Sequence, residues 1–119
     1  MNKIILSGNI VEDVNFMKTS NGSYFLKNKI AVQDNAKTEY EDTYFIPFRT
    51  FSKDVLKTFK TLKKGSLIEI EGKLVHKNYN KNGNWNTYCE VIVFKVNEIK
   101  FKKKENKEFF ELDDDDIPF

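Results

Sequence analysis

Five segments of the chain are rich in apolar residues that favour strands, and this pattern predicts five β-strands. Successive side chains of a strand point to opposite faces, so alternate positions share a face. The strands are predicted at residues 3–11, 24–33, 44–51, 66–79 and 87–101. Gly8 interrupts the first strand, which predicts a bulge or a bend there. Turn or loop segments are expected at residues 20–22, 34–43 and 80–84, the last with the hairpin signal Asn82-Gly83.

One segment follows the period of a helix instead. In KDVLKTFKTLKKG, residues 53–65, the apolar positions recur at helical spacing and form one face. This face consists of Val55, Leu56, Phe59 and Leu62. The ends are marked by Ser52 as the N-cap, Asp54 in the first turn, Lys63 and Lys64 in the last turn, and Gly65 just beyond.

Five strands with a helix after the third match the element order of the OB-fold, an all-β, five-stranded Greek-key barrel. The barrel is predicted to occupy residues 1–104. Residues 105–119 are predicted to form a short, disordered acidic tail.

Strand parity separates predicted core residues from outward ones. The core is predicted to include Leu26, Ile30 and Val32 of the second strand and Ile68, Ile70 and Leu74 of the fourth. The opposite faces carry Phe25, Lys27 and Lys29 in the second strand and Glu69, Glu71, Lys73, Val75, Lys77 and Tyr79 in the fourth.

The third strand leaves two alternatives open. Either Tyr44, Ile46 and Phe48 face the core, or Phe45, Pro47, Arg49 and Phe51 do. If the second set faces outward, it presents aromatic rings and the chain's single arginine on one surface. Pro47 removes a ladder donor, which predicts that this strand is locally an edge or is bulged.

Length and composition restrict the class of protein. With 119 residues and one cysteine, Cys89, the chain is expected to be one domain without an internal disulfide, and Cys89 to be a small packing residue. No apolar run approaches the ~18 residues of a membrane helix, and the first residues lack a signal-peptide pattern. These observations predict a cytoplasmic protein without a membrane segment.

Charge is distributed unevenly along the chain. Residues 105–119 hold seven acids and one base, a net charge of −6, whereas the other 104 residues hold 19 bases and 11 acids, a net charge of +8. A basic body attracts polyanions, and nucleic acid is the commonest of these. Lys81 and Trp85, at the tip of the predicted hairpin, extend the surface that the outward faces of the strands are expected to form.

Aromatic rings alternate with cations on the outward faces of three predicted strands. Rings stack on bases and cations contact phosphates, so such a surface holds a single strand without reading its sequence. The alternatives are that any one ring belongs to the core, that the lysines form an ordinary solvated face, or that the fold binds oligosaccharide or protein.

Three segments carry a family resemblance. NKIILSGNIVEDV at the start, LKKGSLIEIEGKL at residues 62–74 and DDDDIPF at residues 113–119 resemble the bacterial and phage single-stranded DNA-binding protein family, or SSB family. The resemblance covers nearly the whole chain in order. It implies sequence-independent binding and protection of single-stranded DNA in replication, recombination and repair, and a homotetramer.

The resemblance also implies stacking positions. Ungapped matching from KKGSLIEIEG places them at Phe45 and Phe51, which face outward in one of the two alternatives for the third strand, and at Tyr79, which parity also places outward. A fourth falls near Asn35 or Ala36 and is not aromatic, with Tyr40 or Tyr44 as the compensating candidates. The candidate stacking residues are Phe25, Phe45, Phe51, Tyr79 and Trp85, and the candidate phosphate ligands are Lys27, Lys29, Arg49, Lys73, Lys77 and Lys81.

The end of the chain carries a second expected function. In the family, the acidic tip is a docking peptide for replication, recombination and repair proteins. This assigns steering to Asp113, Asp114, Asp115 and Asp116, an apolar contact to Ile117 and Phe119, and a conformational restraint to Pro118. The tail can also occupy the protein's own basic groove. Only about ten residues separate the barrel from Asp113, which favours a phage or plasmid origin.

Other classes of protein find less support in the sequence. Consecutive aspartates on a tail do not form a rigid Mg²⁺ site, and His76 has no ligand partner at metal spacing. We therefore expect no enzyme activity, metal or cofactor. The remaining alternative is an OB-fold module for RNA binding or primosome assembly. Phe94, Ile99 and Phe101 either complete the core or form a subunit interface, and Phe109 and Phe110 have no assigned role.

Overall fold

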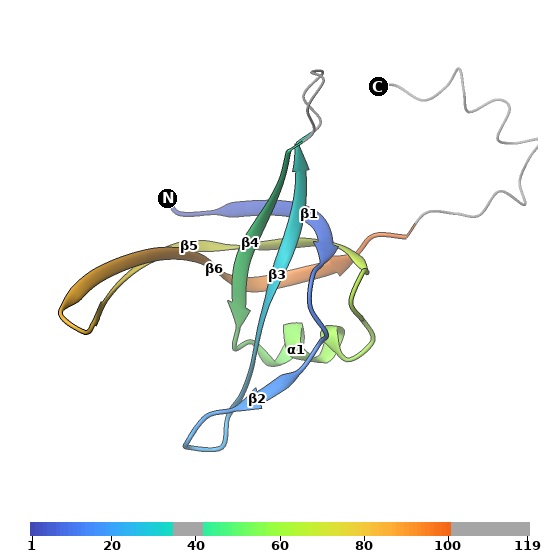
Figure 1. The fold of residues 1–119 in the computed structure, drawn as a ribbon. Coiled ribbons are helices and arrows are strands. Elements are labelled where there is room, and N and C mark those ends of the chain that lie inside the picture. The colour runs from blue at the N-terminus through green and yellow to red at the C-terminus, as the bar shows by residue number, and fades with distance from the viewer. Residues whose placement is uncertain (35–41, 101–119) are drawn as a thin grey trace, which may run out of the picture.

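The computed structural model describes residues 1–34 and 42–100. Within them, the chain forms six strands and one helix (Figure 1). In chain order these are β1 (Ile4–Ile10), β2 (Phe16–Lys18), β3 (Tyr24–Asp34), β4 (Asp42–Thr50), α1 (Lys53–Phe59), β5 (Leu67–Lys81) and β6 (Asn84–Glu98). The five predicted strands and the helix are confirmed. The short strand β2 was not predicted.

Five of the strands close into a barrel. The sheet order is β1-β5-β6-β4-β3-β2, and an additional pairing between β1 and β3 joins the two sides. All pairings are antiparallel except that of β4 with β6, which is parallel. The helix lies between the third and fourth barrel strands, as the OB-fold prediction requires. The short strand β2 pairs only with β3 and extends the sheet past the barrel.

Two glycines lie where strands pass very close to each other. A Cβ atom on Gly8 would lie 2.1 Å from the carbonyl oxygen of Ala31, and one on Gly72 would lie 2.1 Å from that of Ile92. The register of β1 with β5 runs through Gly8 without a shift, so the predicted bulge is absent there. At the next residue β1 also begins to pair with β3, so Gly8 permits the close approach that closes the barrel.

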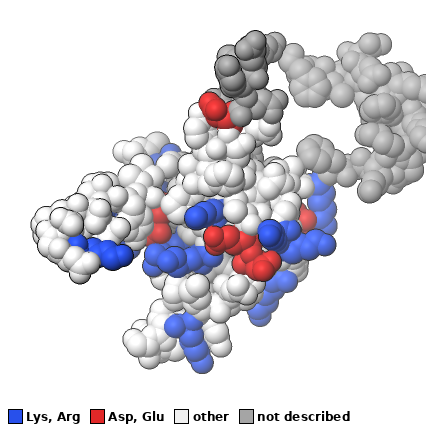
Figure 2. Space-filling model, viewed as in Figure 1, with Lys and Arg blue, Asp and Glu red and all other residues white. Residues whose placement is uncertain are grey.

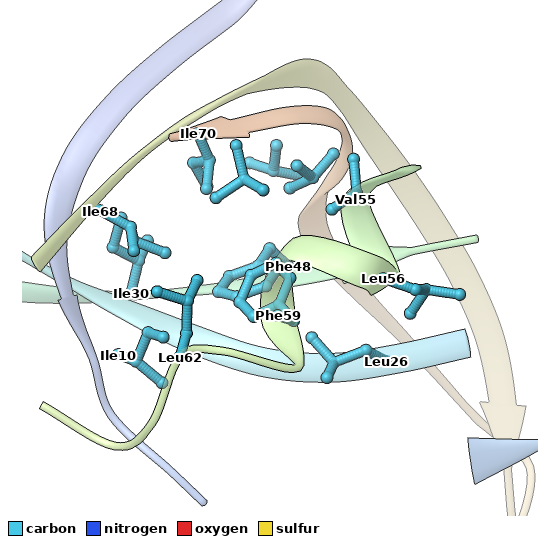
Figure 3. Packing of buried hydrophobic residues seen from close by; sticks show 13 residues of the cluster. Ile10, Leu26, Ile30, Phe48, Val55, Leu56, Phe59, Leu62, Ile68 and Ile70 are labelled. Atoms are coloured by element: carbon cyan, nitrogen blue, oxygen red, sulfur yellow. The ribbon is translucent and has the colours of Figure 1, made fainter. Parts of the chain in front are cut away.

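The barrel interior and one face of α1 form a single core (Figure 3). Phe48 of β4 contacts Phe59 of α1 with ring centroids 5.8 Å apart, and this contact packs the helix against the barrel. The predicted core residue Val32 is only partly buried and packs against the cluster. The cluster comprises Ile10, Leu26, Ile30, Phe48, Val55, Leu56, Phe59, Leu62, Ile68, Ile70, Val91, Val93 and Val96.

The helix begins where predicted but ends early. The Ser52 side chain accepts a hydrogen bond from the backbone N–H of Val55 and caps α1, and Asp54 lies in the first turn. After Phe59 the backbone bonds become i→i−3, from Lys60 to Lys57 and onward to Leu62, and they tighten the chain. Lys63 and Lys64 therefore follow the helix, which corrects the expectation that they lie in its last turn. Gly65 likewise does not stand just beyond the helix, whose C-cap is Lys60, and its φ of +94° belongs to the turn before β5.

Beyond the barrel, β5 and β6 continue as a two-stranded ribbon (Figure 1). We call residues 76–89 the arm, and all of them are exposed. Glu71 pairs with Lys95 and Gly72 with Val93, so Phe94 has no partner and forms a bulge. A bulge bends a ribbon and increases its twist. Asn82 and Gly83 both have positive φ, which confirms the predicted tight turn at the tip.

Two predictions about the core are wrong. Leu74 is 41% exposed, although it shares parity with the buried Ile70. Its face was assigned correctly, since it pairs with the buried Val91, but the pairing of β5 with β1 ends at Gly72, so Leu74 lies at the rim of the barrel. Cys89 is exposed, not a packing residue, because it lies in the arm, beyond the barrel.

Several predictions fall outside the described residues. These concern the polar segment 35–41, including Asn35, Ala36 and Tyr40, and everything after Lys100, including Phe101, Phe109, Phe110, the domain boundary after residue 104 and the tip at residues 113–119. At the flanks of the first segment, β3 extends to Asp34 and β4 begins at Asp42, so Asp34, Asp42 and Thr43, predicted to lie in the loop, belong to strands.

Candidate nucleic-acid interface

The structure decides which side of β4 faces outward. Phe48 is buried at 1% exposure, whereas Phe45 and Phe51 are 58% and 51% exposed. Pro47 and Arg49 lie on the same outward side and are half-buried. The second of the two sets left open by the sequence therefore forms the surface. β4 pairs with β6 only at Phe48 and Arg49, so the segment before Phe48 is a local edge, as Pro47 predicted.

Three outward residues of β3 extend this surface. The β3–β4 register sets Lys27 opposite Arg49 and Lys29 opposite Pro47. Phe25 stacks on Phe51 with ring centroids 5.7 Å apart, and the Arg49 guanidinium lies 5.9 Å from the centre of the Phe25 ring. Phe25 and Phe51 are thus each held in position by a neighbouring side chain in the absence of a ligand. We call this surface the barrel face; it consists of Phe25, Lys27, Lys29, Phe45, Pro47, Arg49 and Phe51.

A groove connects the barrel face with the base of the arm. It has a volume of about 310 Å³. Lysines from β3 form one wall, Arg49 and Pro47 lie on β4, and Tyr88 and Glu90 of β6 form the other wall. The lining residues are Glu12, Lys27, Asn28, Lys29, Pro47, Phe48, Arg49, Tyr88 and Glu90.

Glu90 lies between two of the predicted phosphate ligands. Its side chain is 3% exposed, and Oε1 lies 3.2 Å from Nε of Arg49 and 3.7 Å from Nζ of Lys77. The contact with Arg49 is an ion pair without the alignment of a hydrogen bond. One buried carboxylate thus offsets part of the charge of both cations and links the barrel to the arm. Sequence reasoning missed Glu90, because its neighbour Arg49 comes from a distant strand joined to β6 by parallel pairing.

Lys29 of β3 forms a weaker ion pair than Arg49 does. Lys29 Nζ lies 4.0 Å from Oε2 of Glu12, and both side chains are about half exposed. An exposed ion pair at this distance contributes little, on the order of 0–1 kcal/mol. Lys29 therefore stays available to a phosphate.

The arm carries different groups on its two faces. Tyr79 contacts Tyr88 edge to face at 5.9 Å, and Lys77 pairs with Tyr88 across the ribbon. Lys81 has the parity of Tyr79, so the two share this face. Trp85 pairs with Asn80 and lies on the opposite face, where it is 71% exposed. A strand that contacts both Tyr79 and Trp85 must therefore pass around the edge of the ribbon.

Other candidates occupy less central positions. Lys73 lies at the base of the arm and pairs with Ile92 on the outward side of the barrel. Tyr44 is 48% exposed and lies on the opposite side of β4 from Phe45, and the fourth stacking position, near Asn35 or Ala36, falls outside the described residues. His76 pairs with Cys89 on the Trp85 face of the arm. Among residues 1–34 and 42–100, no group of three potential metal ligands comes together.

Basic side chains dominate the charged surface around the barrel. Figure 2 shows Lys and Arg spread across one face, with a smaller group of Asp and Glu among them.

Away from the groove, the Lys3 ammonium donates a hydrogen bond to Glu71 at 2.8 Å and holds the pKa of that carboxyl below its usual value of 4.5. No helix in the described part of the chain has the length and apolar character needed to cross a membrane.

A family comparison fits this geometry. The model of the single-strand binding protein family matches residues 1–101. The chain belongs to the single-strand binding protein family. A curated member, the single-stranded DNA-binding protein of Malacoplasma penetrans (strain HF-2), is 25% identical over 107 residues. The match covers 89% of this chain but 56% of that protein, so the chain spans about half the length of its curated relative.

Solved structures show the same fold. A Plasmodium falciparum SSB in complex with ssDNA superposes with a TM-score of 0.76 at 16% identity, covering 84% of this chain and 96% of that one. The mitochondrial single-stranded DNA-binding protein Rim1 of S. cerevisiae superposes with a TM-score of 0.69 at 19% identity, covering 82% and 94%. The SSB-family OB-fold expected from the sequence is thereby confirmed.

Proposed function

We propose that the protein binds single-stranded DNA without sequence preference and protects it during replication, recombination and repair. The observation that carries this proposal is the barrel face, where two exposed rings and three cations share one surface that continues through a groove to the arm. Membership of the family and the names of its relatives support the same ligand. The protein acts as a binding protein and not as an enzyme.

Each part of the surface has a distinct task. Phe25, Phe45, Phe51 and Tyr79 stack on bases, with Phe25 beside Phe51, and Trp85 takes a base that has passed around the arm. Each stacked base contributes about 1–3 kcal/mol to binding. Contacts to phosphates contribute a salt-dependent part, and they come from Lys27, Lys29, Arg49, Lys73, Lys77 and Lys81.

The titration of a labelled oligo-dT tests this function. Fluorescence anisotropy at low and high salt should show tight binding that weakens as salt rises, together with much weaker binding of a duplex of the same length. The chain has a single tryptophan, so quenching of its emission reports separately on the arm. Equal affinity for RNA and DNA homopolymers would instead favour the RNA-binding module, and no binding to oligo-dT at low salt would overturn the proposal.

A second proposal concerns the tip at residues 113–119. Four aspartates followed by Ile117, Pro118 and Phe119 combine steering charge with apolar side chains that do nothing for solubility. We assign this tip to the docking of replication, recombination and repair proteins. Deleting residues 117–119 should abolish binding to a purified host partner while leaving the affinity for oligo-dT at high salt unchanged. Retained partner binding contradicts the assignment.

The acidic tail also competes with DNA for the basic surface of the barrel. Its net charge of −6 opposes the +8 of the rest of the chain. Removing residues 113–119 should therefore tighten DNA binding at low salt, and the difference should fade as salt screens the charges. Equal affinities at low salt would exclude this competition.

For assembly, we propose a homotetramer that works in the cytoplasm on DNA. Exposed apolar side chains on β1, β5 and β6 supply candidate contacts; they are Ile5, Leu74 and Phe94, at 56%, 41% and 53% exposure. Light scattering after gel filtration should give about four times the 14.0 kDa mass of one chain. A monomeric mass at micromolar concentration contradicts the tetramer.

A further inference from the structure

A second groove lies between the β2–β3 hairpin and α1, on the other side of Phe51 from the barrel face. Its volume is about 730 Å³. None of the residues that sequence reasoning assigned to DNA lines it except Phe51. The lining residues are Phe16, Gly22, Ser23, Tyr24, Phe51, Lys53, Leu56, Lys57 and Lys60. We call this space the helix groove.

The chemistry of the helix groove repeats that of the barrel face. Phe16 and Tyr24 are 38% and 54% exposed, and they share the face of β2 and β3 that turns toward α1. Lys53, Lys57 and Lys60 follow one another at helical spacing on the opposite wall, and all three are exposed. Among the residues that the structure describes, the groove is lined by three cations and no carboxylate. Its rim gains a further cation, because Nζ of Lys18 lies 5.4 Å from the centre of the Tyr24 ring.

Phe51 makes the two surfaces continuous. Its ring stacks on Phe25 of the barrel face and also lines the helix groove. β4 ends at Thr50, whose partner on β3 is Leu26, so β4 does not extend beside Tyr24 and Phe25. The sheet is therefore open at this corner. A chain that lies across Phe51 can turn there from one surface to the other without crossing a strand.

We propose that the helix groove is a second subsite for single-stranded DNA, which receives the nucleotides that follow the base stacked on Phe51. Phe16 and Tyr24 contact bases, and Lys57 and Lys60 contact the phosphates between them. The inference rests on the proposed function, because it extends the path of the same strand. The charge of the wall selects a polyanion, and the rings select one with flat apolar groups.

A paired set of variants tests the subsite. Lys57→Ala/Lys60→Ala removes two cations from the helix groove, whereas Lys63→Ala/Lys64→Ala removes two exposed cations that do not line it. Each phosphate contact on a single strand contributes about 0.7 to the slope of log K against log salt. The first variant should lower the slope for a long oligo-dT by about 1.4, and the second should leave it unchanged. Thermal unfolding of both variants checks that the fold is retained.

A length series separates this subsite from the barrel face. Affinity for dT oligonucleotides should rise with length in the wild-type protein, and the Lys57→Ala/Lys60→Ala variant should stop gaining at a shorter length. If the two proteins show the same length dependence and the same salt slope, the subsite does not exist, although the proposed function stands. If neither protein binds any length at low salt, the proposed function itself fails.

Cross-linking locates the strand directly. Oligo-dT with one 5-iodouracil at successive positions should cross-link to Tyr24 or Phe16 at one end of the bound strand, as read by mass spectrometry of the peptides. The alternative occupant of the helix groove is the acidic tail. In that case the Lys57→Ala/Lys60→Ala variant should release the tail and bind DNA more tightly, whereas the subsite predicts weaker binding. Tighter binding that disappears when residues 113–119 are removed would overturn the subsite.

Discussion

Arg49 and Glu90 bring the third and fifth barrel strands together through an ion pair at the centre of the binding surface, with Nε and Oε1 3.2 Å apart. The carboxylate is nearly buried, and the guanidinium lies over the Phe25 ring. Glu90 therefore holds Arg49 in position and at the same time reduces the attraction that a phosphate experiences. Lys77 shares the same carboxylate, so the arm is held by the same contact.

Replacing this carboxylate should change binding and stability in opposite directions. Glu90→Gln leaves Arg49 and Lys77 without their counter-charge, so oligo-dT should bind more tightly, most clearly at low salt. The free energy of unfolding should fall by about 1–3 kcal/mol, less than for a fully buried pair, because both cations retain access to water. Anisotropy titrations and urea unfolding measure the two effects. Weaker DNA binding would mean that Glu90 mainly orients Arg49.

Aromatic substitutions on the two faces of β4 offer a matched comparison. Phe45→Ala should weaken oligo-dT binding by about 1–3 kcal/mol, which is about 5- to 150-fold. Tyr44→Ala removes a ring of similar exposure, 48% against 58%, from the opposite face and should leave the affinity unchanged. Equal losses for the two variants would contradict the assignment of the binding surface.

The Lys3–Glu71 ion pair predicts a pH dependence of stability. The hydrogen bond from Lys3 lowers the pKa of Glu71 from 4.5, so folding favours the carboxylate. Its contribution is then present above about pH 4.5 and is lost as pH falls through the lower folded-state pKa. Unfolding by urea should show Glu71→Gln less stable than wild type at pH 7, with the gap closing in acid. Lys3→Ala should reproduce this pattern, and a gap that persists in acid would contradict it.

The close strand crossing at Gly72 predicts a severe effect of a single methyl group. Gly72→Ala places Cβ 2.1 Å from the Ile92 carbonyl oxygen, a backbone atom that cannot move alone. The variant should lose about 3 kcal/mol of stability or more. Gly83→Ala adds a methyl group in open space at a φ of +83° and should lose about 1 kcal/mol. Similar losses would mean that the crossing relaxes easily.

Much of the fold was predictable because local patterns survive in it. Segments rich in strand-favouring residues identified the barrel strands, and helical spacing identified Val55, Leu56, Phe59 and Leu62, all of them buried. Parity also sorted β3 correctly, since Leu26 and Ile30 are fully buried and Lys27 is exposed. These signals arise within single elements, where neighbouring residues alone decide the pattern.

The features of the fold that were not predicted from the sequence all depend on contacts between elements. β2 has only three residues, all exposed, and it forms because β3 is long enough to receive it. Leu74 alternates correctly and pairs with the buried Val91, but it lies at the rim of the barrel, past the end of the pairing with β1. The Phe94 bulge bends the ribbon without any signal in its own residue type.

The candidate site was predictable only in part. Parity together with the family resemblance identified the exposed rings Phe45 and Phe51 and the outward side of β4. Glu90 and the helix groove were not found, because both depend on which strands and helices meet in space. Neither the parallel contact between β4 and β6 nor the packing of α1 beside the β2–β3 hairpin leaves a periodic trace in the sequence.

The order in which the strands are made affects how the barrel closes during synthesis. Ile4 of β1 pairs with Gly72 of β5, and Ile10 of β1 pairs with Ile30 of β3. A ribosome releases the chain from its N-terminal end, so β1 remains unpaired on the β5 side until residue 72 has emerged. Each barrel strand after β1 and up to β5 can pair with one already made, but the ring closes only when β6, the last strand of the barrel, pairs with both β4 and β5. The pairing of Phe48 with Val91 then joins segments far apart in the chain, and such pairings are intrinsically slow.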